Sequence, residues 1–139
     1  MECARVGILT CSNTTRVLDC SVGACLSDMY ERKGAFERYR DREIVLAGLI
    51  ACNGCPTVAG AATIVPRVES LVQSGAKYVH VSYCMLALCP FVKKYARVVQ
   101  DAFPEVEVVL GTHEPHQSEQ QFRCAVGAML EDRQKTIIP

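Results

Sequence analysis

The chain has 139 residues, of which 50% are apolar and 22% are charged, and its fifteen basic and fifteen acidic residues cancel to a net charge of zero. This length and composition predict a single folded domain over residues 1–139 with its own hydrophobic core, and they exclude a disordered chain. The balanced charge gives no electrostatic basis for binding nucleic acid or an anionic membrane surface, so neither is expected as a partner.

No segment of the sequence predicts a membrane span or a secretion signal. The longest apolar run, residues 44–52, has nine residues, which is too short to cross a bilayer. The first residues show no basic segment followed by an apolar stretch and a small-residue cleavage site. We therefore expect a cytoplasmic protein.

Four apolar segments predict the strands of a sheet, at residues 5–10, 43–50, 77–83 and 106–110. The first two are almost continuously apolar, which is typical of parallel strands covered on both faces. Amphipathic segments alternate with the strands. This alternation predicts an α/β fold with an open, mainly parallel four-stranded sheet of the flavodoxin-like or Rossmann-like kind, helices on both faces and strand order 2-1-3-4.

Helices are expected in four segments: 27–39, 66–74, 90–102 and a last helix after residue 118. Gly34 is expected to interrupt the first, and Pro66 to kink or restart the second. Gly75 is a favourable residue for the end of that second helix. Ser118 and Gln121 form a capping box at the start of the last helix.

Two of these helices carry apolar stripes that are expected to face the core. In the 90–102 helix the expected inward side chains are Phe91, Tyr95, Val98 and Ala102. In the last helix they are Phe122, Ala125, Val126, Met129 and Leu130.

Nine cysteines are many for a chain of this size, and their number is odd. The chain can build a core without disulfide bonds. In a reducing compartment, so many thiols indicate metal binding or redox chemistry more than a disulfide framework. Their positions relative to the predicted strands therefore decide how they are interpreted.

Each predicted strand is followed by a cysteine or a histidine. In an open parallel sheet, ligands bind beyond the carboxyl ends of the strands, and all of these ends lie at one edge. Cysteines also occur in the long loop after the first strand, which begins at that edge. The sequence therefore predicts a metal site there, with Cys20 as a weaker candidate ligand. The candidate ligands are Cys11, Cys25, Cys52, Cys55, Cys84, Cys89 and His113.

Other cysteines and histidines are expected to lie outside this site. Cys3 is at the opposite end of the first strand, about 20 Å away at roughly 3.3 Å per residue. Cys124 falls nearly opposite the apolar stripe of its helix. His80 is inside the third strand and is expected to be a hydrogen-bonded core residue. His116 is expected to be a solvated loop residue.

Two cysteines each precede a proline near an expected helix start, in Cys55-Pro56 and Cys89-Pro90. The positive end of a helix dipole favours a thiolate over a thiol. A thiolate is both a metal ligand and a nucleophile, so this feature does not choose between metal binding and redox chemistry.

An ordered set of motifs over residues 5–114 resembles the CGGC domain family, which is named for a Cys-Gly-Gly-Cys segment after a strand. Here that segment is Cys52-Asn53-Gly54-Cys55, and the departure at Asn53 leaves both thiols in place. The resemblance implies a metal-binding domain, with zinc as the metal, and it implies no particular reaction. The other matching features are Cys11, Gly23-Ala24-Cys25-Leu26, Lys33-Gly34-Ala35-Phe36, His80-Val81-Ser82-Tyr83-Cys84, Cys89-Pro90 and Gly111-Thr112-His113.

Several chemistries remain open for these residues. Four thiolates, or three with a histidine, suit tetrahedral zinc, and the same donors suit an iron–sulfur cluster. Cys52 and Cys55 have the spacing of a redox dithiol. A metal carrier or sensor without turnover is a further alternative. Up to eight candidate ligands exceed the four that one zinc ion needs, so either two ions bind or some thiols stay uncoordinated.

Two other functions are disfavoured at the loop after the first strand. A phosphatase or arsenate reductase of this fold has five residues between its cysteine and its arginine, whereas four residues lie between Cys11 and Arg16. The loop contains no glycine that would let its backbone surround an oxyanion. The same lack of glycine, and the absence of tryptophan from the chain, argue against a flavin.

Overall fold

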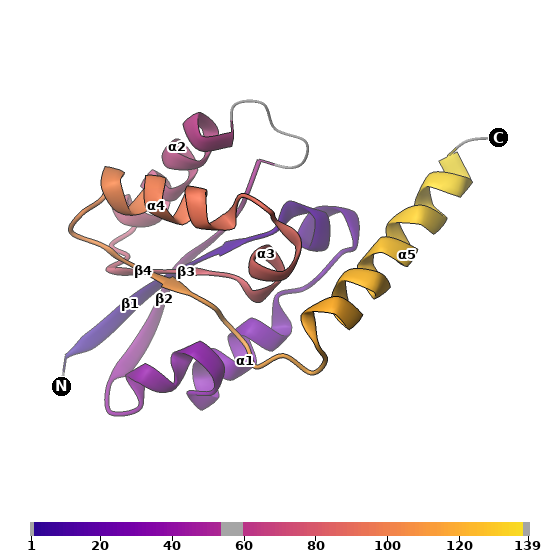
Figure 1. Cartoon of the computed structure of the whole chain (residues 1–139). Coiled ribbons are helices and arrows are strands. Elements are labelled where there is room, and N and C mark those ends of the chain that lie inside the picture. The colour runs from indigo at the N-terminus through magenta and orange to yellow at the C-terminus, as the bar shows by residue number, and fades with distance from the viewer. Residues whose placement is uncertain (1, 54–59, 138–139) are drawn as a thin grey trace.

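The computed structural model of the chain describes residues 2–53 and 60–137, with side chains for residues 2–53 and 62–129. It contains a four-stranded sheet of β1 (Cys3–Thr10), β2 (Glu43–Ala51), β3 (Tyr78–Val81) and β4 (Glu107–Leu110). All neighbouring strands are parallel and their order is β2-β1-β3-β4. The predicted α/β fold, its open parallel sheet and its strand order are therefore confirmed (Figure 1).

The register of the sheet brings the carboxyl ends of its strands to the same level. Thr10 of β1 pairs with Ala51 of β2, and Leu9 pairs with Val81 of β3. Val81 pairs in turn with Leu110 of β4. The residue that follows each strand therefore emerges at one common edge, which is the condition for side chains from different strands to meet.

Helices cover both faces of the sheet. On one face lie α2 (Gly60–Gln73) and α4 (Val92–Ala102), and on the other lie α1 (Gly23–Glu31) and the 3-10 helix η2 (Gly34–Tyr39) (Figure 1). Each face has its own buried cluster, because successive residues of β1 point to opposite sides. Leu9 packs with the α2 and α4 side chains, whereas Ile8 packs with those of α1 and η2.

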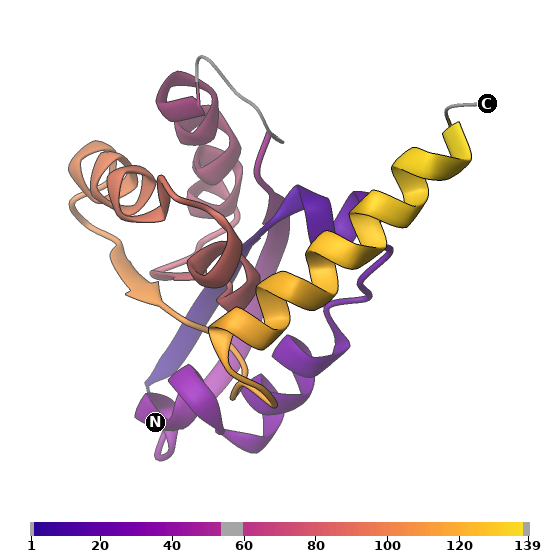
Figure 2. The same ribbon diagram turned by 45° about the vertical axis from the view of Figure 1, so that its right-hand side comes forward.

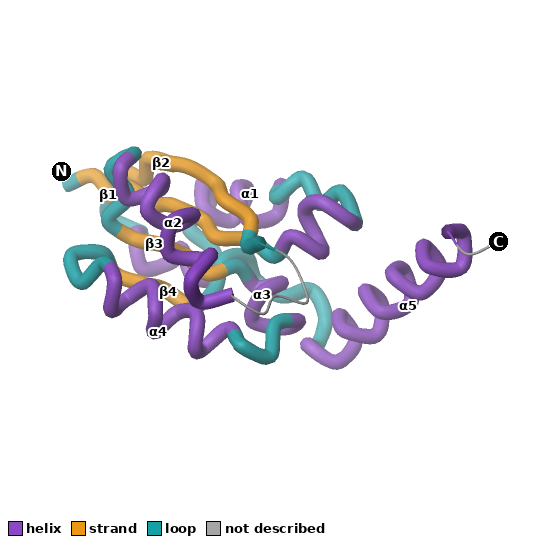
Figure 3. The backbone as a smooth tube through the Cα atoms, turned by 90° about the horizontal axis from the view of Figure 1, so that it is seen from above, coloured by secondary structure: helices purple, strands orange, loops and turns teal. Residues whose placement is uncertain are grey.

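Three further elements surround the carboxyl edge. A single π-helical turn, η1 (Asn13–Val17), follows β1, and α3 (Tyr83–Leu88) follows β3. The last helix, α5 (Glu119–Ile137), begins beside α3 and extends away from the sheet, as Figures 2 and 3 show from two directions. Its predicted capping box is confirmed, since the Gln121 amide donates to Ser118 Oγ at 3.1 Å and the Gln121 side chain accepts from the Ser118 amide at 3.0 Å.

The expected helix over 27–39 is two helices in the structure. Arg32 ends α1 in the left-handed region, and Gly34 begins η2 with φ +57°. A Cβ atom on Gly34 would lie 2.5 Å from the Thr112 carbonyl oxygen. Glycine is therefore needed there both for the positive φ and for the close approach of the loop after β4.

The helix does not restart at Pro66. α2 begins at Gly60 and runs through Pro66 to Gln73 as one helix. A proline inside a helix removes one backbone hydrogen bond, and burial of the Ile64 and Val68 side chains on either side of it offsets that loss. The helix then ends as predicted, with Gly75 at φ +96°.

The apolar stripe of α4 is displaced from the predicted one. Its buried residues are Val92, Tyr95 and Val99, whereas Phe91 is 56% exposed. α4 also begins at Val92, two residues later than expected, because the chain first forms α3. In α5, Val126 is buried as predicted, but Met129 is 52% exposed.

Candidate functional site

Three cysteines that follow neighbouring strands meet at the carboxyl edge, Cys11 and Cys52 directly after β1 and β2 and Cys84 three residues after β3. The spatial order of the strands is β2, β1, β3, so the order of their cysteines is Cys52, Cys11, Cys84. The Cys11 thiol is hydrogen-bonded to the side chains of both Cys52 and Cys84. We call these three residues the thiol cluster. They meet because the strand order places β1 in the centre and because the register aligns the strand ends.

Cys84 lies in the first turn of α3, and hydroxyl groups surround its sulfur. Ser82, the N-cap of α3, has its Oγ 2.9 Å from Cys84 Sγ, and Thr14 Oγ1 of η1 is 3.2 Å from the same sulfur. The hydrogen bond from Cys11 lowers the pKa of Cys84 below that of an ordinary cysteine, and the two hydroxyls add to this against the opposing effect of burial. Cys84 therefore ionises more readily than Cys11.

Cys11 is the corresponding proton donor. Its side chain is buried, and its pKa is raised because it is hydrogen-bonded to Cys52 and to Cys84 and is removed from water. A thiol that donates to a neighbouring thiolate is harder to ionise, since a second negative charge would face the first. The arrangement therefore favours a thiolate at Cys84 over a thiolate at Cys11.

The loop after β1 also supports Cys52. The Ser12 backbone N–H donates to Cys52 Sγ at 3.3 Å, and the Cys52 backbone N–H donates to the Thr10 carbonyl at 2.9 Å. The amides of Thr14 and Thr15 donate to the Cys11 carbonyl. These contacts join the ends of β1 and β2 and keep the two sulfurs adjacent.

Cys25 and His113 form a second contact at the same edge. Cys25 Sγ of α1 donates to Thr112 Oγ1 at 3.2 Å and lies 3.4 Å from His113 Nδ1, in the loop after β4. Burial raises the pKa of the Cys25 thiol and lowers the pKa of His113. Cys84 and Cys25 also interact electrostatically, which places this pair next to the thiol cluster. Of the predicted ligands, the structure thus brings five together: Cys11, Cys25, Cys52, Cys84 and His113.

Other predicted candidates lie differently. Cys89 ends α3 and packs against the core cluster that contains α2 and α4. It precedes α4 by three residues rather than standing at its first turn. Cys20 is exposed, and its sulfur accepts from the Val22 amide at 3.4 Å. Cys55 and the Cys55-Pro56 segment lie outside the described residues.

The residues expected outside the site are where the sequence predicted them. Cys3 begins β1 at the opposite edge, and Cys124 is exposed on α5. His80 is fully buried, with its Nδ1–H donating to the Gly111 carbonyl at 2.8 Å and its Nε2 accepting from Tyr39 Oη at 2.7 Å. Burial lowers the pKa of His80 to about 4. His116 is exposed.

Sequence reasoning missed the hydroxyl groups around the sulfurs. Ser82, Thr14 and Thr112 are each buried and each contact a cysteine sulfur. Ser82 could have been found from the preference of serine for the N-cap position, because a helix that begins at residue 83 would bring its hydroxyl close to Cys84 in the first turn. No local pattern indicated that Thr14 and Thr112 would reach Cys84 and Cys25, because both contacts join segments far apart in the chain.

The thiols of the thiol cluster contact one another through hydrogen bonds, and they are not already arranged as the ligands of a metal ion. Over residues 2–53 and 62–129, no three His, Cys, Asp or Glu side chains are arranged so that they could hold a metal ion as they stand. The donors are therefore chemically suited to a soft metal, but their present positions are those of thiols in contact with each other.

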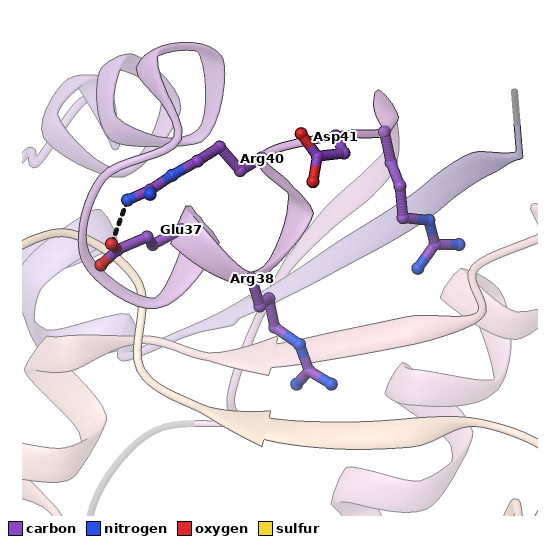
Figure 4. Close-up of a pocket in the computed structure, with 5 residues that line it drawn as sticks. Glu37, Arg38, Arg40 and Asp41 are labelled. Carbon is purple, nitrogen blue, oxygen red and sulfur yellow. Dashed lines mark hydrogen bonds and ion pairs between the residues drawn. The ribbon is translucent and has the colours of Figure 1, made fainter.

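A second hollow lies beside η2, near the amino ends of β2 and β4, away from the thiol cluster. Figure 4 shows its charged lining, with Arg40 paired to Glu37. Arg38 forms an ion pair with Glu107 at 2.6 Å, and Arg42 donates to Tyr78 Oη at 2.7 Å. Because these arginines already have partners within the protein, the hollow offers less to a ligand than the cysteine-rich edge does.

The fold and the edge define a class: an open parallel α/β protein with cysteines gathered at the carboxyl ends of its strands. The model of the CGGC domain family matches residues 5–113, and the chain belongs to this cysteine-rich family. An uncharacterized protein of Methanocaldococcus jannaschii is 32% identical over 95 residues, which cover 65% of this chain and 69% of that protein. No solved structure matches the chain significantly. Among the described helices, none has both the length and the apolar character needed to cross a bilayer.

Proposed function

We propose that the protein binds a thiophilic metal ion, with zinc as the first candidate, through the thiol cluster at the carboxyl edge of the sheet. The observation that carries the proposal is the contact of Cys11 with both Cys52 and Cys84, from three adjacent strands. Thiolates are preferred ligands of zinc, at Zn–S distances of about 2.3 Å. At tetrahedral angles this separates neighbouring sulfurs by about 3.8 Å, so the ion would replace the hydrogen bonds between the thiols.

The cluster supplies three of the four ligands that a zinc site needs. The fourth is proposed to come from Cys55, which follows Cys52 by three residues, with Cys25, Cys89 and His113 as the other candidates. Binding replaces the Cys11 proton by the ion, since a cysteine coordinates as thiolate. The Ser82 and Thr14 hydroxyls contact Cys84 Sγ and would orient it, as outer partners of metal ligands do.

The proposal is tested by metal analysis of the chain purified without oxygen. Cys11→Ser, Cys52→Ser and Cys84→Ser are each expected to lower the bound metal, because a serine hydroxyl stays protonated at neutral pH and does not replace a thiolate. Cys3→Ser and Cys124→Ser are the matched controls and should keep the wild-type stoichiometry. A wild-type chain without metal, or cluster variants with full stoichiometry, would contradict the proposal.

The appearance of the same preparation identifies the metal centre. Colourless protein with stoichiometric zinc supports the zinc site, whereas brown protein supports an iron–sulfur cluster on the same thiols. The two alternatives are thereby separated before any variant is made.

A thiol redox function is the second candidate. The observation that favours it is the hydrogen bond between Cys84 and Cys11, since a thiol with a lowered pKa beside a second thiol is the arrangement of a dithiol pair. The Cys52 and Cys55 pair offers the same chemistry by its spacing. Colourless, metal-free protein whose thiols oxidise in pairs would favour this function over metal binding.

A further inference from the structure

A cavity of about 290 Å³ lies between the segment that joins η1 to α1, the start of α3 and the first half of α5. Apolar side chains form most of its wall. Leu18 and Val22 come from the segment before α1, and Phe122, Val126 and Met129 come from α5. We call this space the α5 cavity. It borders the thiol cluster, because Cys84 belongs to both.

Contacts with α3 hold α5 over this cavity. The Phe122 ring lies 5.4 Å from the Tyr83 ring, and Arg123 Nε donates to the Ala87 carbonyl. Val126 is buried against the cavity, whereas the helix beyond it extends away from the sheet (Figure 2). The first half of α5 therefore covers the cavity, and it is held in place by contacts with α3, the short helix that carries Cys84.

The charge and size of the α5 cavity restrict its occupant. Among the described residues that line it, none is Lys, Arg, Asp or Glu, and His113 is the one histidine. A charged ligand would therefore meet no Lys, Arg, Asp or Glu side chain in this wall, so a neutral ligand is favoured. The volume is about twice that of a 150 Å³ cavity that takes benzene, which leaves room for a small organic molecule but not for a peptide segment.

Thiols provide the reactive part of the wall. Cys84, Cys25 and Cys20 all line the α5 cavity, and Ser82 and Thr14 line it beside the Cys84 sulfur. Thiols exchange with disulfides through a mixed disulfide. An apolar pocket of this size with sulfur at its surface is suited to a ligand that carries sulfur of its own.

We propose that the α5 cavity binds a small, neutral, largely apolar organic disulfide, and that Cys84 exchanges with it. The Cys84 sulfur attacks one sulfur of the ligand and forms the Cys84–ligand S–S bond. The S–S bond of the ligand breaks, its second half leaves as a thiolate, and the Cys84 proton passes to solvent. The organic disulfide is the oxidant, and Cys84 is the group that it oxidises.

The test uses the full chain, prepared without oxygen and treated with a chelator, and the neutral probe dithiodipyridine, which releases a coloured thiol on exchange. The rate at Cys84 is expected to saturate as the probe concentration rises, because binding precedes exchange. Exposed Cys124 on the same helix is the internal reference, and its rate should rise linearly. Mass spectrometry of labelled peptides assigns each rate to its cysteine.

A charged probe and two variants complete the design. For each probe, the rate at Cys84 is divided by the rate at Cys124. This ratio should be at least about tenfold lower for the dianionic dithiobis(nitrobenzoate) than for dithiodipyridine. Val126→Phe fills the cavity and should slow the reaction of dithiodipyridine at Cys84 by about tenfold. Gln120→Phe, at an exposed position of the same helix outside the cavity wall, should not. Circular dichroism establishes that each variant is folded. If Val126→Phe does not fold, saturation in the wild-type chain still decides.

The outcomes separate this inference from the proposed metal site. The cavity proposal would be overturned, whether or not metal binds, if the rate at Cys84 rose linearly with probe concentration and the ratio of the Cys84 rate to the Cys124 rate were the same for both probes. Labelling that is the same with and without the chelator, together with an absence of metal, would overturn the metal proposal and leave the cavity standing. Saturable labelling of Cys84 that depends on the cavity supports the inference in either case.

Discussion

Acidification is expected to destabilise the protein through His80. The residue is fully buried, stacks on Phe36 at 4.5 Å and makes hydrogen bonds to Gly111 and Tyr39 with its two ring nitrogens. Its pKa in the folded state is lowered to about 4 by burial, from 6.5. Since the unfolded chain binds the proton more readily, the free energy of unfolding falls as the pH drops from 6.5 towards 4.

The size of the effect follows from this shift. A difference of about 2.5 pKa units corresponds to about 3 kcal/mol at 1.36 kcal/mol per unit. The loss is nearly complete at pH 4 and absent above pH 7.5, where His80 is neutral in both states. A change of this size is a large fraction of the 5–15 kcal/mol that is typical of small domains.

The assay is chemical denaturation at a series of pH values between 4 and 7.5, for the wild type and for His80→Gln. A glutamine side chain can donate to Gly111 and accept from Tyr39 but does not titrate. The variant is expected to be less stable at pH 7.5 by about 1–2 kcal/mol, because the stack on Phe36 is lost. Its stability should also depend less on pH, so that the difference from wild type shrinks or reverses by pH 4.

The comparison between the two chains removes the contribution of the carboxylates, which titrate in both. His116→Gln is the matched control, because that side chain is exposed, and it should leave the pH profile unchanged. Parallel profiles for the wild type and His80→Gln would refute the reasoning, since they would mean that His80 binds protons equally well in the folded and unfolded states.

Three further predictions concern the surroundings of the edge. Gly34→Ala should lower the free energy of unfolding by about 1–3 kcal/mol, because of its positive φ and the approach of Thr112; thermal melting checks it, and unchanged stability would contradict it. Ser118→Ala should cost about 1 kcal/mol by removing the cap of α5 and should raise hydrogen exchange in its first turn, whereas a Gln120→Ala control should not. Removing bound metal should lower the free energy of unfolding by about 2.7 kcal/mol if the free metal had been present at a hundred times its Kd. It should also raise hydrogen exchange, mainly in residues 11–42. Melting curves that are the same with and without a chelator would contradict this prediction.

Local sequence patterns were sufficient for the framework that positions the site. The apolar runs predicted the four strands, and the alternation with helices predicted a parallel sheet with order 2-1-3-4, which the structure has. Handedness and short connections leave few topologies for such a pattern. Cys11, Cys52 and Cys84 could then be assigned to one edge, because carboxyl ends of parallel strands lie together. The capping box at Ser118 and the end of α2 at Gly75 depend on neighbouring residues, and both were predicted correctly.

The tertiary structure decided everything that depends on contacts between distant segments. α4 faces the core with Val92 and Val99 rather than with Phe91. Residues after β3 form α3 instead of continuing the strand, with Ser82 capping that helix. The burial of Met85 and Ala87 against the rest of the fold supports this short helix, and no periodicity in six residues reveals it.

The chemistry of the edge shows the same division. The sequence by itself determined which strand ends carry sulfur, since that needs only the strand pattern and the positions of the cysteines. The tertiary structure decided that Thr14 and Ser82 surround Cys84, that Cys25 meets His113, and that α5 covers the space beside them. These are contacts between side chains up to 88 residues apart, whose formation depends on how the whole chain packs rather than on any local preference.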